Sequence, residues 1–335
     1  MGFYPVTAGA RDRFVLERRS PPTEPDPWRY QNLIVEDEPG EEGRIARVAT
    51  VFLTGRECPW RCVMCDLWQT TTSSDTPEGA IPAQLAAARE EIDRRLDSVT
   101  TIKLYNAGSF FDPRAVPERD YDAIALSLTG FSHVIVESHP SLVGPRVDRF
   151  LESLLRRQVE RAAPPRLEVA MGLETAHPDA LERLHKRMTV DQFAAAAHAL
   201  GRRGVALRVF LLISPPFVPP EEQDEWLCLS IDVAFSCAAS AVSLIPTRSG
   251  NGAMEALAAG GCFRPPRLDD IERSAQTAHA RGRRRGRIFV DLWDLKRFAD
   301  CPHCFEARRA RLQAMNLNQR VSPPIACGSC GGGLS

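Results

Sequence analysis

Three cysteines in one short loop constrain this chain more than any other feature of its sequence. Cys58, Cys62 and Cys65 follow directly after the apolar run 48–53, with the spacing C-x3-C-x2-C. Iron–sulfur clusters are held by cysteine thiolates, and three ligands on a four-iron cube leave one iron open to another molecule. A structural zinc ion requires four protein ligands, and a disulfide would leave one cysteine over. The loop therefore favours a 4Fe-4S cluster.

The composition limits what else the chain can be. Its 335 residues are 44% hydrophobic and 25% charged with a net charge of -1, so the chain can bury a large core and is not a generally basic nucleic-acid binder. No secretory signal peptide opens it, and no apolar run reaches the roughly 18 residues that predict a membrane span. The ten cysteines then indicate a reducing compartment. We expect a cytoplasmic protein without a membrane partner.

Alternation of β-branched runs with amphipathic stretches predicts the fold. Six strands are expected, at residues 48–53, 101–105, 133–137, 167–173, 206–213 and 241–245. Six βα units in succession favour a parallel sheet with helical crossovers. We therefore predict an α/β fold with three parts. A partial (β/α)6 barrel of TIM type spans residues 45–290, an irregular N-terminal arm spans 1–44, and a small metal-binding extension spans 291–335.

Four further cysteines lie near the C-terminus, in the pairs Cys301-Pro-His-Cys304 and Cys327-Gly-Ser-Cys330. Two C-x2-C pairs at this separation predict one closed four-thiolate metal site. Zinc is the favoured metal, and a second iron–sulfur cluster is the alternative because four thiolates also suit a cube. The segment around them is polar and rich in arginine. We therefore expect its order to depend on the metal.

Four segments beyond the cysteine loop resemble one branch of the radical S-adenosylmethionine (SAM) superfamily. They are Leu104-Tyr-Asn-Ala-Gly-Ser-Phe110, Val134-Ile-Val-Glu-Ser-His-Pro140, Val169-Ala-Met-Gly-Leu-Glu-Thr175 and Leu211-Leu-Ile-Ser-Pro-Pro-Phe217, with Phe263-Arg-Pro-Pro266 further on. Over about residues 45–270 the chain is similar to the archaeosine-forming radical SAM proteins of tRNA modification, distant relatives of the Elongator catalytic subunit. Two positions depart from that branch: Ser214 stands where Lys is frequent, and Ile245 stands where Asn is favoured.

This resemblance implies a chemistry. In the superfamily the open iron chelates the amino and carboxylate groups of SAM, and an electron from the cluster splits SAM into methionine and a 5'-deoxyadenosyl radical that abstracts hydrogen from the substrate. The branch implies C–N bond cleavage, a lyase-type reaction, in a lysine adduct on a 7-deazaguanine base. The implied partners are a reductant of ferredoxin or flavodoxin type, tRNA or a modified nucleoside, and an enzyme that attaches the lysine.

Residues after the predicted strands complete the candidate site, because chemistry in such barrels lies at the C-terminal ends of the strands. The candidate cofactor-binding residues are Met64, Gly108, Ser109, Glu137, Glu174, Lys186 and Arg187. The methionine would pack on the SAM adenine, where the superfamily usually has an aromatic residue. The glycine and serine would present backbone amides to the methionyl group. The glutamates would bind ribose hydroxyls, and either cation would neutralise the SAM carboxylate.

Two other functions fit the same residues. One is a radical SAM enzyme of natural-product or peptide metabolism. The other is a non-enzymatic, metal-dependent RNA-binding protein whose cysteines are all structural. The run Arg281-Gly-Arg-Arg-Arg-Gly-Arg287 contains five arginines, and it fits an RNA-docking edge as well as a solvated turn.

Overall fold

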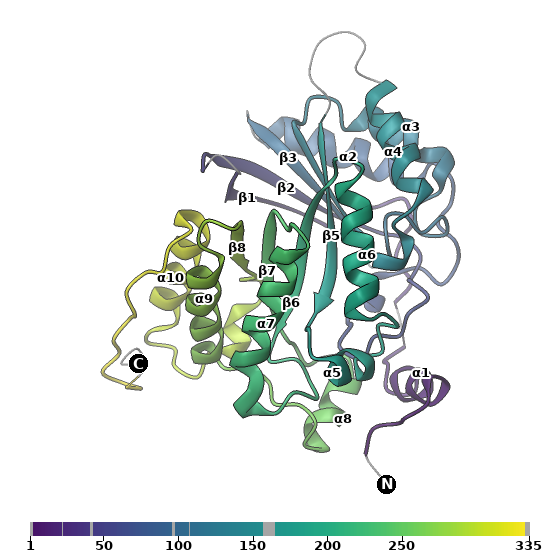
Figure 1. The fold of residues 1–335 in the computed structure, drawn as a ribbon. Coiled ribbons are helices and arrows are strands. Elements are labelled where there is room, and N and C mark those ends of the chain that lie inside the picture. The colour runs from purple at the N-terminus through teal and green to yellow at the C-terminus, as the bar shows by residue number, and fades with distance from the viewer. Residues whose placement is uncertain are drawn as a thin grey trace.

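The computed structural model describes residues 3–21, 23–40, 43–95, 98–106, 108–156 and 165–331. Within them, eight strands form one sheet in the order of the chain. They are β1 (Asn32–Pro39), β2 (Ile45–Leu53), β3 (Val99–Asn106), β4 (His133–Glu137), β5 (Arg166–Glu174), β6 (Ala206–Ile213), β7 (Ala241–Pro246) and β8 (Arg287–Val290). β1 is antiparallel to β2, and all later neighbours are parallel. The sheet curves into a nearly closed barrel (Figure 1), which confirms the predicted fold class.

Helices surround this barrel (Figure 1). They are α1 (Ala8–Leu16), α2 (Ala80–Arg95), α3 (Tyr121–Ser127), α4 (Pro145–Arg156), α5 (Pro178–Arg183), α6 (Val190–Gly201), α7 (Gln223–Ser236), α8 (Ala253–Ala259), α9 (Leu268–Gly282) and α10 (Phe305–Asn318). Of these, α1, α5 and α8 lie at the lower end of the barrel in Figure 1. The pleat of the strands explains the packing: in β5, Leu167, Val169 and Met171 join the apolar core beneath the helices, whereas Glu168 faces the barrel interior. In the part of the chain that the structure describes, no helix has the length and apolarity to cross a membrane.

The N-terminal arm is more regular than predicted. It contains the nine-residue helix α1 and the strand β1, whose partners on β2 run from Asn32↔Phe52 to Pro39↔Ile45. The prediction of an irregular arm is wrong for these two segments. An isolated helix of this length is marginal in water, so packing of the arm on the barrel decides its structure where local sequence does not. The predicted boundaries between the arm and the barrel (44/45) and between the barrel and the C-terminal extension (290/291) stay predictions.

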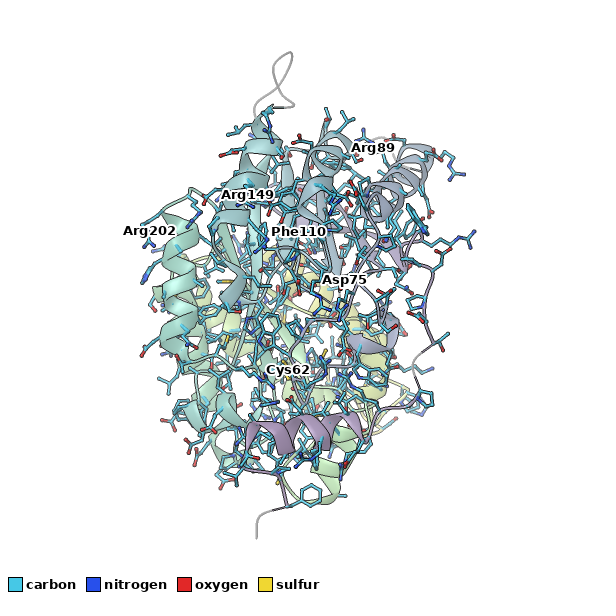
Figure 2. All side chains as sticks on the ribbon, turned by 90° about the vertical axis from the view of Figure 1, so that its right-hand side faces the viewer. Cys62, Asp75, Arg89, Phe110, Arg149 and Arg202 are labelled. Carbon is cyan, nitrogen blue, oxygen red and sulfur yellow. The ribbon has the colours of Figure 1, made fainter. Side chains whose placement is uncertain are left out.

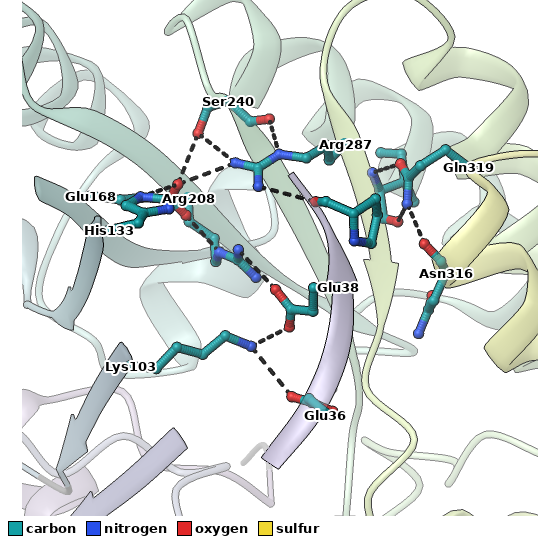
Figure 3. Close-up of polar contacts among 12 residues, drawn as sticks. Glu36, Glu38, Lys103, His133, Glu168, Arg208, Ser240, Arg287, Asn316 and Gln319 are labelled. Atoms are coloured by element: carbon teal, nitrogen blue, oxygen red, sulfur yellow. Dashed lines mark hydrogen bonds and ion pairs between the residues drawn. The ribbon is translucent and has the colours of Figure 1, made fainter. Parts of the chain in front are cut away.

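Helix α10 spans the gap between the first and last strands. It contacts both β1 and β8, which do not pair with each other in the described sheet. The amide side chain of Asn316 accepts from the backbone N–H of Val290 (2.8 Å) and donates to its carbonyl (2.8 Å). Gln319 makes the same pair of hydrogen bonds with Ile288 (2.7 and 2.8 Å; Figure 3). Two side chains thus cover the free edge of β8, where a further strand would otherwise pair.

The C-terminal extension also contributes to the main core. Phe305, Leu312 and Met315 of α10 are buried and belong to the same apolar cluster as the barrel strands. Apolar packing and the edge hydrogen bonds therefore hold this helix against the barrel. The expectation that a metal alone orders the segment underestimated these contacts, because they join residues that are far apart in the sequence.

A network of buried charges fills the barrel near the beginnings of the strands (Figure 3). Glu168 is fully buried and accepts from Arg208 Nε (2.7 Å) and Arg287 Nη2 (3.2 Å). Arg208 also reaches Glu38 (3.3 Å), which forms an ion pair with Lys103. Although burial opposes ionisation, Arg208 and the other cations around Glu168 hold the pKa of its carboxyl well below the usual value. Each buried charge has an opposite charge beside it, as the low-dielectric interior requires.

The arginine run before β8 has internal partners. Arg281 and Arg285 form ion pairs with Asp232, and Arg287 belongs to the buried network. The run precedes β8, so it lies at the opposite end of the barrel from the cysteine loop, which follows β2. This arrangement favours the solvated turn over an RNA-docking edge near the candidate site.

Candidate functional site

The cysteine loop lies at the C-terminal ends of the strands, and Cys58, Cys62 and Cys65 in it are half-buried (Figure 2 labels Cys62). Their sulfur atoms do not form a group in which all ligand atoms lie within 4.8 Å of one another. Within the described residues, the only His, Cys, Asp or Glu atoms that form such a group, all within 4.8 Å of one another, belong to the C-terminal cysteines. Thiolates of a cubane cluster bind different irons and are spread around it, whereas those of a single ion converge. The loop geometry fits a cluster better than a single ion.

Burial sets the protonation of these thiols. Desolvation raises the pKa of Cys62 to about 12, and it also raises the pKa of Cys58 and of Cys65. Buried thiols of this kind are neutral until a metal supplies positive charge, and a metal that binds them deprotonates them. The protonation of these thiols, and not only their spacing, therefore fits a metal cluster.

A buried ion pair lies beside the loop. Lys186 Nζ binds the carboxylate of Glu174, and both side chains are about 10% exposed. Burial lowers the pKa of Lys186, but Glu174 and the thiol of Cys62 outweigh it and raise the pKa overall. A Cβ at Gly172 would overlap the ends of both side chains of the pair, so any larger residue there would displace them. Glu174 itself has φ of 67°, a conformation that non-glycine residues adopt only when their surroundings enforce it.

Helix α1 determines which predicted cation faces the thiols. Asp12 on α1 accepts from His185 Nε2 (2.9 Å) and from Arg187 Nη2 (2.6 Å). These are the two neighbours of Lys186, and both have positive φ, 62° and 57°. Arg187 is thereby held at the surface with 44% of its side chain exposed, and Lys186 turns inward toward Glu174.

His139 joins three loops of the site. Its ring stacks on Trp60 of the cysteine loop, with centroids 3.7 Å apart and an interplanar angle of 11°. Its backbone N–H donates to Ser109 Oγ (2.9 Å), and Nε2 donates to the carbonyl of Lys186 (2.9 Å). Burial and the Lys186 charge lower the pKa of His139 to about 3, so the ring is neutral. Ser109, predicted to bind cofactor through its amide, therefore also holds a histidine that the prediction did not include.

A second thiol group lies at the start of α10. Cys301 Sγ is 4.0 Å from Cys327 Sγ, and Cys304 Sγ is 3.8 Å from Cys330 Sγ. All four ligand atoms lie within 4.8 Å of one another. The two C-x2-C pairs thus meet at one centre that can bind a metal.

Two known proteins are similar to this chain in sequence. No family model matches the chain. The archaeosine synthase subunit beta of Methanosarcina acetivorans is 28% identical over 274 residues, which cover 78% of this chain and 74% of that protein. An uncharacterized protein of Methanocaldococcus jannaschii is 22% identical over 248 residues, or 71% of this chain and 66% of that protein. The similarity to archaeosine synthase subunit beta supports the resemblance to the archaeosine-forming proteins that the sequence motifs indicated.

A solved structure shares the fold of this chain. The Elp3 protein of Methanocaldococcus infernus, with an N-terminal deletion, has a TM-score of 0.52 at 13% identity. The match covers 81% of this chain and 63% of that chain. It agrees with the barrel in Figure 1, and the similarity to a subunit of archaeosine synthase supports an enzyme.

The remaining candidate residues also lie at this end of the radical SAM barrel. Glu137 ends β4 and is half-buried, and its backbone carbonyl accepts from the N–H of Phe110 (2.8 Å). Gly108 is half-buried just after β3. Met64 is partly buried and packs against the apolar cluster that contains Val63. The candidate residues thus come from the loops after β2, β3, β4 and β5.

Sequence reasoning missed Asn251, which supports the cysteine loop. Its side chain is 4% exposed and donates to the carbonyls of Val63 (2.8 Å) and Cys65 (3.0 Å). Its carbonyl oxygen accepts from the N–H of Met254 (2.8 Å) at the start of α8. The available signal was Gly-Asn-Gly just after a strand, which predicts only a turn.

We expect Asn251→Ala to loosen the cysteine loop. It removes two donors from buried carbonyls, at a cost of about 1 to 3 kcal/mol. A reconstituted variant should lose iron to a chelator several-fold faster than the wild type, measured by the decay of absorbance near 400 nm. Gln69→Ala is the matched control, because Gln69 is exposed and reaches only the carbonyl of Gly250 (3.2 Å). Equal decay of the absorbance in Asn251→Ala and in the wild type would show that Asn251 does not support the cysteine loop.

Proposed function

We propose that this chain is a cytoplasmic radical SAM enzyme of the archaeosine type, in which Cys58, Cys62 and Cys65 hold a 4Fe-4S cluster. The observation that carries the proposal is three half-buried thiols beside a buried Glu174–Lys186 pair at the strand ends. The relation to archaeosine synthase subunit beta supports it. When bound and reduced, such a cluster supplies the electron that cleaves SAM.

The chain's own residues would bind and orient SAM. Lys186 offers a buried cation beside the thiols, and we assign it the SAM carboxylate because Arg187 is held at the surface by Asp12. Glu174, freed from that ion pair, would accept from ribose hydroxyls. Residues at the ends of β2, β3 and β4 or in the loops after them complete the set as proposed from the sequence: Met64, Gly108, Ser109 and Glu137.

For the substrate, we propose a lysine adduct on a 7-deazaguanine base in tRNA. The reaction would break a C–N bond of the adduct, a lyase-type step, and a separate enzyme would attach the lysine beforehand. A reductant of ferredoxin or flavodoxin type would supply the electron. The similarity to archaeosine synthase subunit beta supports this substrate.

Turnover with defined tRNA tests the substrate. Anaerobic, reconstituted protein should convert tRNA bearing the lysine adduct to the amidine nucleoside, with one 5'-deoxyadenosine per product, both measured by mass spectrometry. Unmodified tRNA is the control and should give only background 5'-deoxyadenosine. SAM cleavage without any change in the adduct would refute the tRNA substrate and favour a natural product or peptide.

For the C-terminal centre we propose zinc rather than a second cluster. A tetrahedral zinc site with Zn–S bonds of about 2.3 Å separates its sulfur atoms by about 3.8 Å. The Cys301–Cys327 and Cys304–Cys330 sulfur distances of 4.0 and 3.8 Å fit this value, whereas thiolates of a cubane are spread over different irons.

Elemental analysis tests this metal. We expect one zinc and about four irons per chain, from one four-thiolate site and one cluster. Replacing both Cys327 and Cys330 with serine should remove the zinc and leave the iron, while the segment after α10 becomes sensitive to protease. About eight irons without zinc would mean that both sites hold clusters.

A further inference from the structure

The N-terminal arm crosses the strand ends that carry the candidate site. Arg11 Nη1 donates to the carbonyl of Glu182 at the end of α5 (3.0 Å), and Arg19 Nη1 pairs with Glu57 of the cysteine loop (2.9 Å). Asp12 between them holds both neighbours of Lys186. Figure 2 shows α1 running across the lower end of the molecule, below the labelled Cys62. The arm is therefore part of the wall of the site.

The Tyr4 hydroxyl on this arm is a buried donor without a partner. Tyr4 is 5% exposed, and its ring packs on Phe14 (5.1 Å between centroids) and Phe217 (4.8 Å). No described residue forms a hydrogen bond with the hydroxyl. A buried polar group left unpaired is unfavourable, so a bound molecule that accepts from it recovers the lost hydrogen bond. Burial raises the pKa of Tyr4, and the thiol of Cys62 is one of the groups that act on it.

Arg183 lies next to Tyr4 and likewise has no partner among the described residues. Its guanidinium carbon is 4.0 Å from the ring centroid of Phe217 and 5.9 Å from that of Tyr4. The side chain is half-buried at the end of α5. Arg11, the other cation over the Tyr4 ring, differs because the carbonyl of Pro5 and Glu182 already accept from it. Stacking thus fixes the Arg183 guanidinium in place while its N–H groups stay available.

We propose that Tyr4 and Arg183 together bind a carboxylate at the junction of the arm and the barrel. A phenol hydroxyl and a planar guanidinium both donate hydrogen bonds to carboxylates, and the apolar walls of Phe14 and Phe217 strengthen the attraction by excluding water. The carboxylate has two possible sources, the methionyl end of SAM or the amino-acid end of the substrate adduct. In naming these sources the inference rests on the proposed function.

Binding measurements on the cluster-loaded protein test the site. The variants are Tyr4→Phe, which removes only the hydroxyl, and Arg183→Met, which keeps the apolar stem. Arg13→Met is the matched control, because Arg13 is an exposed arginine on α1. The probes are SAM and tRNA bearing the lysine adduct, each titrated separately. Loss of a charge-assisted hydrogen bond is worth about 1.5 to 3 kcal/mol, which is roughly ten- to a hundredfold in affinity.

The two sources give different results. If SAM supplies the carboxylate, both variants lose at least about tenfold in SAM affinity; if the adduct supplies it, SAM affinity is unchanged and adduct affinity falls. Wild-type affinity for both probes in both variants would overturn the site, as would an equal loss in Arg13→Met. Titration with L-lysine and L-methionine against their amides, followed by thermal shift, still reports carboxylate binding if the proposed reaction fails. Without ligand, Tyr4→Phe should melt no earlier than the wild type, because its hydroxyl has no partner to lose.

Discussion

Replacing Cys62 with alanine is expected to abolish both the iron–sulfur absorbance and the cleavage of SAM. Three thiolates leave one iron of a four-iron cube open. Two thiolates would leave two irons open and would not hold the cluster in the same form. Cys58→Ala and Cys65→Ala should have the same effect. The measurements are iron content after reconstitution, absorbance near 400 nm, and 5'-deoxyadenosine formed with dithionite as reductant.

The chain provides a matched control for this experiment. Cys228 is a half-buried cysteine on α7, outside both thiol groups. Cys228→Ala should keep the cluster and native SAM cleavage, which separates loss of a ligand from general damage to a cysteine-rich protein. A Cys62→Ala protein that forms 5'-deoxyadenosine at the native rate would show that the cluster is held elsewhere.

Glu168→Gln is expected to produce the largest loss of stability among conservative substitutions. The carboxylate is fully buried and compensates Arg208 and Arg287, which are themselves buried. Removing one member of a buried charge network leaves the others uncompensated and costs about 3 to 5 kcal/mol in the free energy of unfolding. The measurement is the urea midpoint of the variant against the wild type.

An exposed ion pair provides the contrast. Asp148, whose side chain is 46% exposed, pairs with Arg203 at 2.7 Å, and Asp148→Asn should cost less than about 1 kcal/mol because solvent screens such a pair. If Glu168→Gln and Asp148→Asn lower the free energy of unfolding by the same small amount, the charges in the barrel contribute no more to stability than surface ion pairs do. The barrel interior would then be hydrated.

The same network determines the response to acid. Burial opposes ionisation of Glu38, but Lys103 and Arg208 lower its pKa from 4.5 to about 2. A carboxyl whose pKa is lower in the folded than in the unfolded state contributes stability above the unfolded value, and this contribution is lost as pH falls toward the folded value. The protein should therefore lose stability progressively between about pH 4.5 and pH 2. In Lys103→Met this acid-dependent loss should be smaller, since Glu38 then has a more ordinary pKa.

Local patterns were sufficient for the barrel and for the C-terminal thiol group. The six predicted strands are β2 to β7, because β-branched runs at regular spacing can be recognised without knowing their partners. The convergence of the C-terminal cysteines also followed from spacing, because each C-x2-C pair brings two thiols together by itself. The ends of parallel strands meet at one edge of a barrel, so the candidate residues after them were expected to be neighbours.

Tertiary contacts decided which of those residues face the site. Sequence left Lys186 and Arg187 equivalent, and the choice between them depends on Asp12, more than 170 residues away along the chain. Asn251, 186 residues from Cys65, supports the cysteine loop through a hydrogen bond that no local pattern indicates. The edge hydrogen bonds of Asn316 and Gln319 to β8 are of the same kind. A hydrogen bond or ion pair between residues far apart in the sequence depends on where the whole fold places them. It can therefore be identified only from the tertiary structure.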